Sequence, residues 1–301
     1  MNIRRTKGFT LMELITVIVI TGIIAGMVAI FIQSPVQGYI SSSNRAALSD
    51  MADTAVRRIG RDLRTAVPNS VRMASPSGST YVEFLPTRDG GMYLALPSGT
   101  TVCGGTSAQD ILDFTYADSC FAILGSTLTM TGPPSSTPDY IVLGSIESPP
   151  ASPTATPAYD TSASGILRAY TGATGAGQTA IHFTATQFPL WAQVQGQRLQ
   201  VIPGDQQAVT YACIGTLGAL DANGNGQAQL IRYWAYGFNP TQAAPPMGGG
   251  LNAILVNNVS ACNIVSSTDY QNNSLIAITL QLTQGSESVQ LYDEIHVTNI
   301  P

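Results

Sequence analysis

The sequence has little charge, few aromatic residues and almost no histidine. Charged residues make up 10% and aromatic residues 7% of its 301 residues, and its two histidines, His182 and His296, lie far along the chain from every cysteine. No CxxC pair, HExxH motif, GxSxG elbow, phosphate loop or dinucleotide fingerprint occurs. Because both histidines fall in strand-like patterns, we interpret them as hydrogen-bonded structural residues. We therefore predict that the protein is not an enzyme.

Positive charge is scarce as well. The chain has 13 basic against 18 acidic residues, a net charge of −5. This balance provides no domain-wide basic surface, so no nucleic-acid partner is expected. The abundance of Ser, Thr, Gly and Pro is typical of an exported protein rich in strands and turns.

The one long apolar run lies at the amino terminus, from Phe9 to Ile32, behind a short leader that carries Arg4, Arg5 and Lys7. About 20 apolar residues at about 1.5 Å per residue span the bilayer core of about 30 Å. The basic leader favours the cytoplasmic side, which places the rest of the chain across the membrane. A secretory signal peptide has a shorter apolar region and a cleavage site after it. The sequence therefore predicts a leader (1–8) and a transmembrane helix (9–32).

Glu13 is the only charged residue in this run. A carboxylate among lipid tails is costly, which marks it as a functional residue. The sequence Arg5-Thr-Lys-Gly-Phe-Thr-Leu-Met-Glu13-Leu resembles the class III signal of type IV pilins and pseudopilins. This resemblance implies that a prepilin peptidase cuts between Gly8 and Phe9 and methylates the new terminus at Phe9. It also implies that Glu13 pairs with the terminal ammonium of a neighbouring subunit and sets the register of the fibre. Burial of either charge alone is costly, and the ion pair between them offsets that cost.

The helix is expected to continue from 33 to 67 as an amphipathic periplasmic segment, with a kink at Pro35 and Gly38 and its end before Pro68. Three- and four-residue spacing predicts one buried face, formed by Leu48, Met51, Ala55, Ile59 and Leu63. Four arginines lie along the same segment: Arg57, Arg58, Arg61 and Arg64. They form either a solvated face or a contact with acidic surfaces of neighbouring subunits; phosphate or DNA contact is the least favoured reading.

Beyond the helix the pattern changes to short strands and turns, which predicts an α+β fold: a long pilin helix packed on an antiparallel β domain, with room for two lobes. We divide this part into a first β region (68–144), a loop or linker rich in Ser, Thr, Pro and Gly (145–178) that contributes no core element, and a second β region (179–301). The clearest signal is the alternation of apolar residues from Ile276 to Leu282 and from Val289 to Val297, which predicts a hairpin with one buried face. Further strands are predicted at 81–85, 111–116, 121–124, 127–131, 140–143, 179–183, 198–202, 208–214 and 229–238.

Four cysteines in an exported chain indicate disulfides, although sequence alone permits three connectivities. We favour Cys103–Cys120 and Cys213–Cys262, because each pair closes within one apparent sub-region. A structural metal site is not expected, since the cysteines and histidines lack metal-ligand spacing.

Asp221, Asn223 and Asn225 match the first ligands of a calcium-binding EF-hand loop. The twelfth position, which needs a glutamate, is Arg232, and flanking helices are missing. We therefore favour a hairpin turn and expect no cofactor, but because some pseudopilins bind calcium a partial calcium site remains open. Trp234, Tyr236 and Phe238 share one face of a predicted strand, where they form either packed core or a surface for a sugar or another ligand.

The second half resembles the MshO group, the minor pilins of mannose-sensitive haemagglutinin (MSHA) type IV pili. The resemblance rests on Gln195 to Ile202, Val209 to Cys213, Ile231 to Gly237, Leu255 to Cys262 and Glu294 to Pro301. It implies an inner-membrane precursor with a periplasmic domain that later reaches the cell surface in a pilus. The implied partners are the prepilin peptidase, the inner-membrane platform protein, and other minor and major pilins. Two alternatives stay open: a minor pseudopilin of type II secretion, and a ligand-binding module displayed at the tip.

Overall fold

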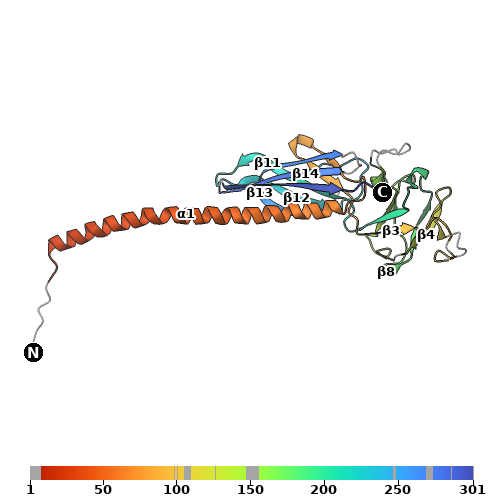
Figure 1. Cartoon of the computed structure of the whole chain (residues 1–301), viewed down its shortest axis with the longest axis horizontal. Helices are drawn as coiled ribbons and strands as arrows, with labels where there is room; N and C mark the ends of the chain where they lie inside the picture. Colours follow the sequence, from red (N-terminus) through yellow and green to blue (C-terminus); the bar gives the residue numbers. More distant parts are fainter. Residues whose placement is uncertain are drawn as a thin grey trace, which may run out of the picture.

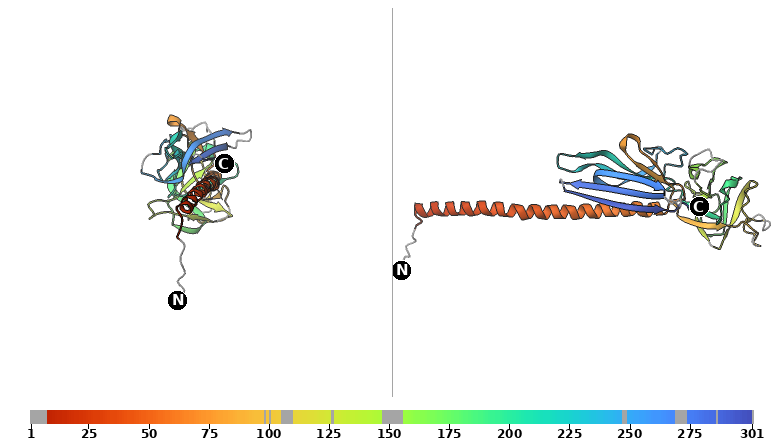
Figure 2. Two further views of the ribbon diagram at one scale, coloured as in Figure 1. Left: turned by 90° about the vertical axis from the view of Figure 1, so that its left-hand side faces the viewer. Right: turned by 45° about the horizontal axis from the view of Figure 1, so that its top comes forward.

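In the computed structural model a single long helix projects from a β domain (Figure 1). The structure describes residues 8–97, 99, 101–104, 110–125, 127–146, 156–246, 249–268, 274–285 and 287–300. The amino-terminal part of the helix extends alone, and its carboxyl-terminal part lies along a sheet (Figures 1 and 2). This arrangement confirms the predicted α+β fold with its long amino-terminal helix.

The helix, α1, runs from Leu11 to Arg64. Its first turn is closed by a capping box, in which the Thr10 hydroxyl accepts a hydrogen bond from the Glu13 backbone and the Glu13 carboxylate accepts one from the Thr10 backbone. Pro35 lies inside the helix without ending it. Figure 1 shows a gentle curve rather than the kink predicted for this region. The helix stops at Arg64, three residues before the predicted end, with Thr65 as its cap.

Seven antiparallel strands form the helix-side sheet, which packs on the second half of α1 mainly through its last three strands. The prediction of a hairpin with one buried face is confirmed there, because Ile276, Leu280 and Ile295 are all buried against the helix. In spatial order the strands are β1 (Arg72–Ala74), β2 (Tyr81–Phe84), β11 (Val209–Leu220), β12 (Gly226–Trp234), β13 (Leu251–Thr268), β14 (Ser274–Gln284) and β15 (Glu287–Val297).

The buried face of α1 differs at one position from the predicted one. Met51 is 38% exposed, whereas Ala52 and Val56 are buried. The other four predicted residues of the stripe are buried as expected, namely Leu48, Ala55, Ile59 and Leu63. The buried face therefore includes Ala52 and Val56, and Met51 lies at its margin.

A second, distal sheet of six strands lies beyond the end of α1 (Figure 1). Its core is aromatic: Phe121 packs against Tyr93 and Phe183, and Phe188 packs against Phe183 and Phe114. In spatial order the strands are β7 (Leu167–Ala169), β6 (Tyr140–Leu143), β10 (Arg198–Ile202), β3 (Asp89–Tyr93), β4 (Asp118–Leu124) and β9 (Ala180–Thr186). The strands β5 (Leu128–Met130) and β8 (Gly175–Gln178) form a separate pair, and there are 3-10 turns at Pro76–Gly78, Pro157–Tyr159 and Leu190–Ala192.

The chain enters the distal sheet after β2 and returns after β10, although β2 and β11 are hydrogen-bonded neighbours. The strands of the first predicted β region (68–144) therefore divide between both sheets, as do those of the second (179–301). Regions that follow one another in sequence are thus interleaved in space.

Two local predictions are wrong. Within 145–178, the described residues 156–178 contribute to the core, because Tyr159, Leu167 and Tyr170 are buried and β7 and β8 lie in this segment. Residues 147–155, which hold most of the proline-rich stretch, fall outside the described part of the chain. The strand predicted at 111–116 is irregular, since Thr115 folds back to donate hydrogen bonds to Asp113.

A buried polar cluster joins the two sheets. Arg72 forms an ion pair with Glu83 at 2.7 Å and stacks over the ring of Tyr159, which belongs to the distal core. The hydroxyl of Tyr236 donates to the other oxygen of Glu83 at 2.9 Å. Burial raises the pKa of Glu83, while the hydrogen bond and charge of Arg72 act in the opposite direction.

Candidate assembly site on the N-terminal helix

The first half of α1 exposes its apolar side chains on every side. The large apolar residues from Phe9 to Ile40 are each 48–81% exposed. The most apolar 18-residue window has a mean hydropathy of 2.8, and none of it is buried, so this helix is long and apolar enough to cross a membrane. An apolar surface of this size requires lipid or other protein around it.

Glu13 lies in the first turn of this exposed half. Its carboxylate accepts hydrogen bonds of 3.1 Å from the backbone N–H and from the hydroxyl of Thr10. A negative charge in the first turn also interacts favourably with the helix dipole. In the single subunit Glu13 is therefore held by its own helix end. Gly8 and Phe9 lie just before this turn, and both are exposed.

The second half of α1 is fastened to the helix-side sheet by polar contacts at two points. Near the start, Glu287 of β15 accepts a hydrogen bond from Ser41 and forms an ion pair with Arg45 at 2.6 Å. These contacts lower the pKa of Glu287, with Ser41 the larger cause and Arg45 the next. We call these three residues the hairpin clasp, because Glu287 follows the turn between β14 and β15.

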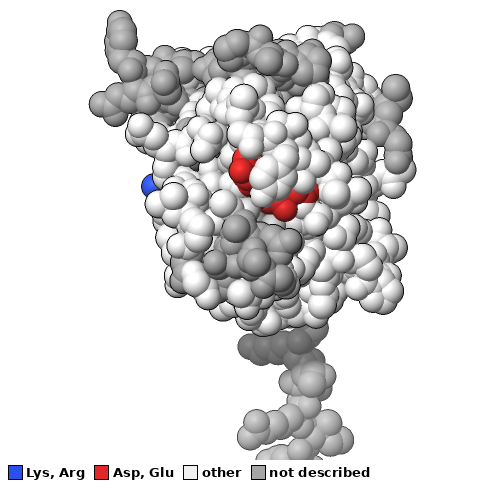
Figure 3. Space-filling view, turned by 90° about the vertical axis from the view of Figure 1, so that its right-hand side faces the viewer, with Lys and Arg blue, Asp and Glu red and all other residues white. Residues whose placement is uncertain are grey.

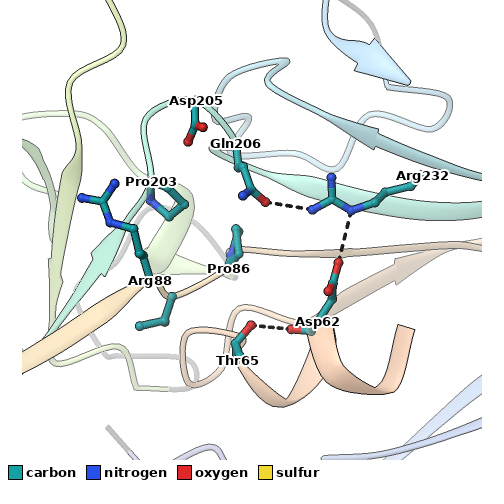
Figure 4. Close-up of a pocket in the computed structure, with 9 residues that line it drawn as sticks. Asp62, Thr65, Pro86, Arg88, Pro203, Asp205, Gln206 and Arg232 are labelled. Atoms are coloured by element: carbon teal, nitrogen blue, oxygen red, sulfur yellow. Dashed lines mark hydrogen bonds and ion pairs between the residues drawn. The ribbon is translucent and has the colours of Figure 1, made fainter. Parts of the chain in front are cut away.

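Near the other end, Asp62 binds two residues of the sheet, and its ion pair with Arg232 is drawn in Figure 4. It accepts a hydrogen bond from the Tyr211 hydroxyl at 2.6 Å and pairs with Arg232 at 3.2 Å. Burial raises the pKa of Tyr211, and Asp62 raises it further. Neither Asp62 nor the hairpin clasp was predicted from the sequence. When an acidic and a basic residue lie on different elements far apart in the chain, their spacing does not indicate that they will form an ion pair.

Asp62 and Arg232 also line a cavity of about 320 Å³ between the end of α1 and the segments that lead to and from the distal sheet (Figure 4). A terminal nitrogen of Arg232 donates to the side-chain oxygen of Gln206 at 2.8 Å. Arg232 therefore binds Asp62 and Gln206 at the same time. Within the described residues, no group of three acids, histidines or cysteines could hold a metal ion.

The four arginines predicted as a stripe are all exposed. Arg57 pairs with Asp53 at 2.7 Å. In the described part of the chain, no carboxylate lies within 4.0 Å of Arg58, Arg61 or Arg64. Arg58 lies towards the helix-side sheet, where it lines a cavity with Trp234 and Ile254. Within the described residues, the second half of α1 thus carries three arginines without a carboxylate in direct contact, and Arg58 faces the sheet.

The three aromatic residues predicted to share a face do not share one. The strand ends at Trp234, and Ala235 adopts a positive φ of 58°. Trp234 is half-buried and its ring lies beside Arg232. Tyr236 is buried and donates a hydrogen bond to Glu83. Phe238 packs edge-on against Tyr140, with ring centres 4.7 Å apart. A shared sugar-binding stripe on these residues is therefore absent, and the turn at Ala235 is the reason.

Both favoured cysteine pairs lie at disulfide distance. The sulfur atoms of Cys103 and Cys120 are 2.07 Å apart, and those of Cys213 and Cys262 are 2.00 Å apart. The first pair ties a loop to β4, and the second links β11 to β13. His182 lies in β9 and His296 in β15, both in strands as predicted.

The calcium candidate lies in the turn between β11 and β12. Asp221 accepts hydrogen bonds of 2.8 Å from the backbones of Asn223 and Asn225. Both bonds lower the pKa of Asp221, and the bond from Asn225 lowers it more than the bond from Asn223 does. The carboxylate therefore closes the hairpin turn that the sequence favoured.

The prokaryotic N-terminal methylation motif matches residues 3–29 of the chain. No curated protein and no solved structure matches significantly. The matched residues include most of the predicted leader, the Gly8–Phe9 junction and Glu13, and the match supports a type IV pilin-like or pseudopilin-like protein.

The motif and the exposed helix together support a membrane-anchored precursor of structural, non-enzymatic character. A class III signal implies processing by a prepilin peptidase and assembly with other pilins.

Proposed function

We propose that this protein is a minor pilin subunit that is processed between Gly8 and Phe9 and enters a type IV pilus through the first half of α1. The observation that carries the proposal is an apolar helix, exposed on all sides, with a single carboxylate one turn from the processing junction. Such a helix is stable in lipid before assembly and in a bundle of like helices afterwards.

Glu13 provides the register in this proposal. Cleavage before Phe9 creates an ammonium group, and a fibre buries both this group and Glu13 in an apolar core. A neighbour in the correct register replaces the Thr10 contacts of Glu13 with an ammonium of opposite charge. A neighbour in another register leaves two buried charges unpaired, which costs about 3–5 kcal/mol.

The test compares wild type with Glu13→Ala, Glu13→Gln and the matched control Asp50→Asn, an exposed acid on the same helix. Intact mass of membrane and sheared-fibre fractions should show a chain that begins at methylated Phe9. We expect Asp50→Asn in the fibres at the wild-type level, and both Glu13 variants depleted at least tenfold there but present in the membrane. A chain that still begins at Met1 in the native host, or Glu13 variants that enter fibres normally, would rule the proposal out.

Within this class we propose an MSHA-type minor pilin similar to the MshO group, located at the pilus tip and assembled with the inner-membrane platform and other minor and major pilins. The distal sheet supports a terminal position, because it extends past the end of α1 and enlarges the subunit beyond one helix and one sheet (Figure 1). The face at its far end carries a small acidic patch and little other charge (Figure 3). Antibody label distributed evenly along the shaft would contradict the tip position.

A minor pseudopilin of type II secretion has the same anchor and is the second candidate. The neighbouring genes separate the two, since secretion genes and pilus genes do not encode the same partners. We propose that neither role needs a cofactor. Calcium at Asp221 is tested by adding 1 mM CaCl₂ to chelator-treated protein: a rise in unfolding temperature that Asp221→Asn abolishes would establish the site.

A further inference from the structure

The distal sheet almost closes into a barrel. Its two outermost strands, β7 and β9, meet at a bridge between Tyr170 and Phe183. Next to this bridge, the backbone of Thr171 donates to His182 at 2.8 Å. Closure of a sheet on itself removes its free edges.

The closure is incomplete on the other side of the bridge. Antiparallel register would pair Ala169 with Thr184, Arg168 with Ala185 and Leu167 with Thr186. No such bridge is present among the described residues. These strand segments instead line a cavity of about 420 Å³ together with Tyr140 and the loop 161–163. Two strand edges thus face each other across an open slot, which we call the β7–β9 opening.

Among the described residues, Arg168 lies in this opening without a carboxylate in direct contact, and its guanidinium stacks over the ring of Phe188 at 4.8 Å. The residue is only 7% exposed, yet within the described chain no carboxylate lies within 4.0 Å of it. Its terminal nitrogens donate to the backbone carbonyls of Ser162, Leu167 and Ala163. Its Nε is buried without a partner.

Burial is the main cause that lowers the pKa of Arg168, and the more distant carboxylate of Asp160 acts against it. A buried arginine without a close counter-ion is unfavourable, and a carboxylate brought to the guanidinium relieves that cost. The other arginines with comparable burial, Arg72 and Arg232, both have their carboxylates in place. Arg168 is the exception in the described part of the chain.

The lining of the opening fits a peptide. Its lining combines the apolar residues Tyr140, Leu167 and Ala185 with the polar residues Thr161 and Thr184. Strand edges recognise an extended chain through its backbone, while side-chain pockets provide selectivity.

We propose that the β7–β9 opening binds an extended acidic segment of a partner protein, which adds to the strand edges and places a carboxylate on Arg168. This site is separate from the first half of α1, through which the subunit is proposed to enter the fibre, since it lies on the distal sheet. A subunit that fails to enter fibres can still bind such a segment.

The test uses full-length protein in detergent and two peptide mixtures, Ac-Xaa-Xaa-Glu-Xaa-Xaa-NH₂ and the same mixture with Gln in place of Glu. Retained peptides are identified by mass spectrometry. We expect Glu peptides to be retained at least tenfold over Gln peptides. Free glutamate should not compete at equal concentration. N-methylation of alternate amides in a selected peptide should weaken its binding at least tenfold, because these amides pair with a strand edge.

Two variants locate the site without removing Arg168 from its loop contacts. Ala185→Trp fills the opening from an exposed position, and Ala222→Trp places the same side chain on a remote hairpin turn as the matched control. We expect the first variant to lose binding at least tenfold and the second to bind like wild type. Equal retention of Glu and Gln peptides, full competition by free glutamate, tolerance of N-methylation, or normal binding by Ala185→Trp would each overturn the proposal.

Discussion

The two halves of α1 are one continuous helix in two different surroundings. From Leu11 to Ile40 it has one charged residue, Glu13, and its large apolar side chains are exposed on every side. From Ser41 to Arg64 it has eight charged residues, and its apolar residues form one stripe that is buried on the sheet. Helical geometry is the same in both, so the difference lies in what each half needs around it: lipid or like helices for the first, its own β domain for the second.

This comparison also separates two kinds of residue. Side chains of the second half stabilise the folded domain, and their loss should appear in unfolding measurements of a single subunit. Side chains of the first half are exposed and do not pack on the described part of the β domain, so their loss should appear only when the membrane or other subunits are present.

The largest effect is expected from truncation of the buried stripe. Ile59 is 1% exposed, and Ile59→Ala removes buried methylene groups and leaves a cavity, at a cost of about 2–5 kcal/mol. Ile20 is 52% exposed, and the matched Ile20→Ala should leave the unfolding free energy unchanged. Urea unfolding of detergent-solubilised protein, followed by tryptophan fluorescence, measures both. Equal destabilisation by the two variants would mean that the first half also packs on the domain.

Sequence patterns predicted the helix, its two halves and the final hairpin because those signals are local. A long apolar run indicates a membrane-spanning helix, and a stripe at helical spacing indicates an amphipathic one. The alternation of apolar residues from Ile276 to Val297 indicates strands with one buried face. The favoured cysteine pairs follow from proximity along the chain and also lie at disulfide distance. Pairing of β2 with β11 could not be predicted, since the strands that separate them in sequence form another sheet.

Other errors arose where tertiary contacts override composition. A stretch rich in Ser, Thr and Gly was expected to be a loop, yet Tyr159 and Tyr170 within it are core residues. The short strands β1 and β7 have too few residues to show alternation. The ion pair of Asp62 with Arg232 joins positions 170 residues apart and leaves no trace in sequence spacing.

The second prediction compares the carboxylates of the two halves. Asp62→Asn removes the partner of a nearly buried arginine. Because Asp62 itself is 19% exposed, we expect a loss of about 2–3 kcal/mol, below that of a fully buried pair. Glu13→Gln should leave the unfolding free energy of the domain at the wild-type value, because among the described residues Glu13 forms hydrogen bonds with Thr10 and with no residue of the β domain. Destabilisation by Glu13→Gln as large as that by Asp62→Asn would contradict the separation.

The third prediction uses pH to contrast a buried and an exposed carboxylate. The pKa of Glu83 is raised by burial, so its folded form gains protons relative to the unfolded chain as the pH falls from 7 towards 4.5. Stability should therefore rise relative to Glu83→Gln over this range. The pKa of Glu287 is lowered by Ser41 and Arg45, so its contribution is present above pH 4.5 and is lost below it.

Unfolding of wild type, Glu83→Gln and Glu287→Gln at pH 7, 5 and 3.5 measures both effects as differences from wild type. The two differences should change in opposite directions with pH. Parallel changes would show that one of the two carboxylates is not in the surroundings described for it.

The smallest effect is expected at the hairpin clasp, where the two halves of α1 meet. Ser41→Ala and Arg45→Ala each remove one contact to Glu287, and exposed ion pairs contribute little to global stability. We expect no shift in the unfolding midpoint but faster hydrogen exchange of the backbone amides near Arg45 and in the β14–β15 turn, because local opening becomes easier. Ser42→Ala, one position along and exposed, is the matched control and should exchange like wild type. Unchanged exchange in Arg45→Ala would mean that apolar packing alone, beginning at Leu48, sets where the helix leaves the sheet.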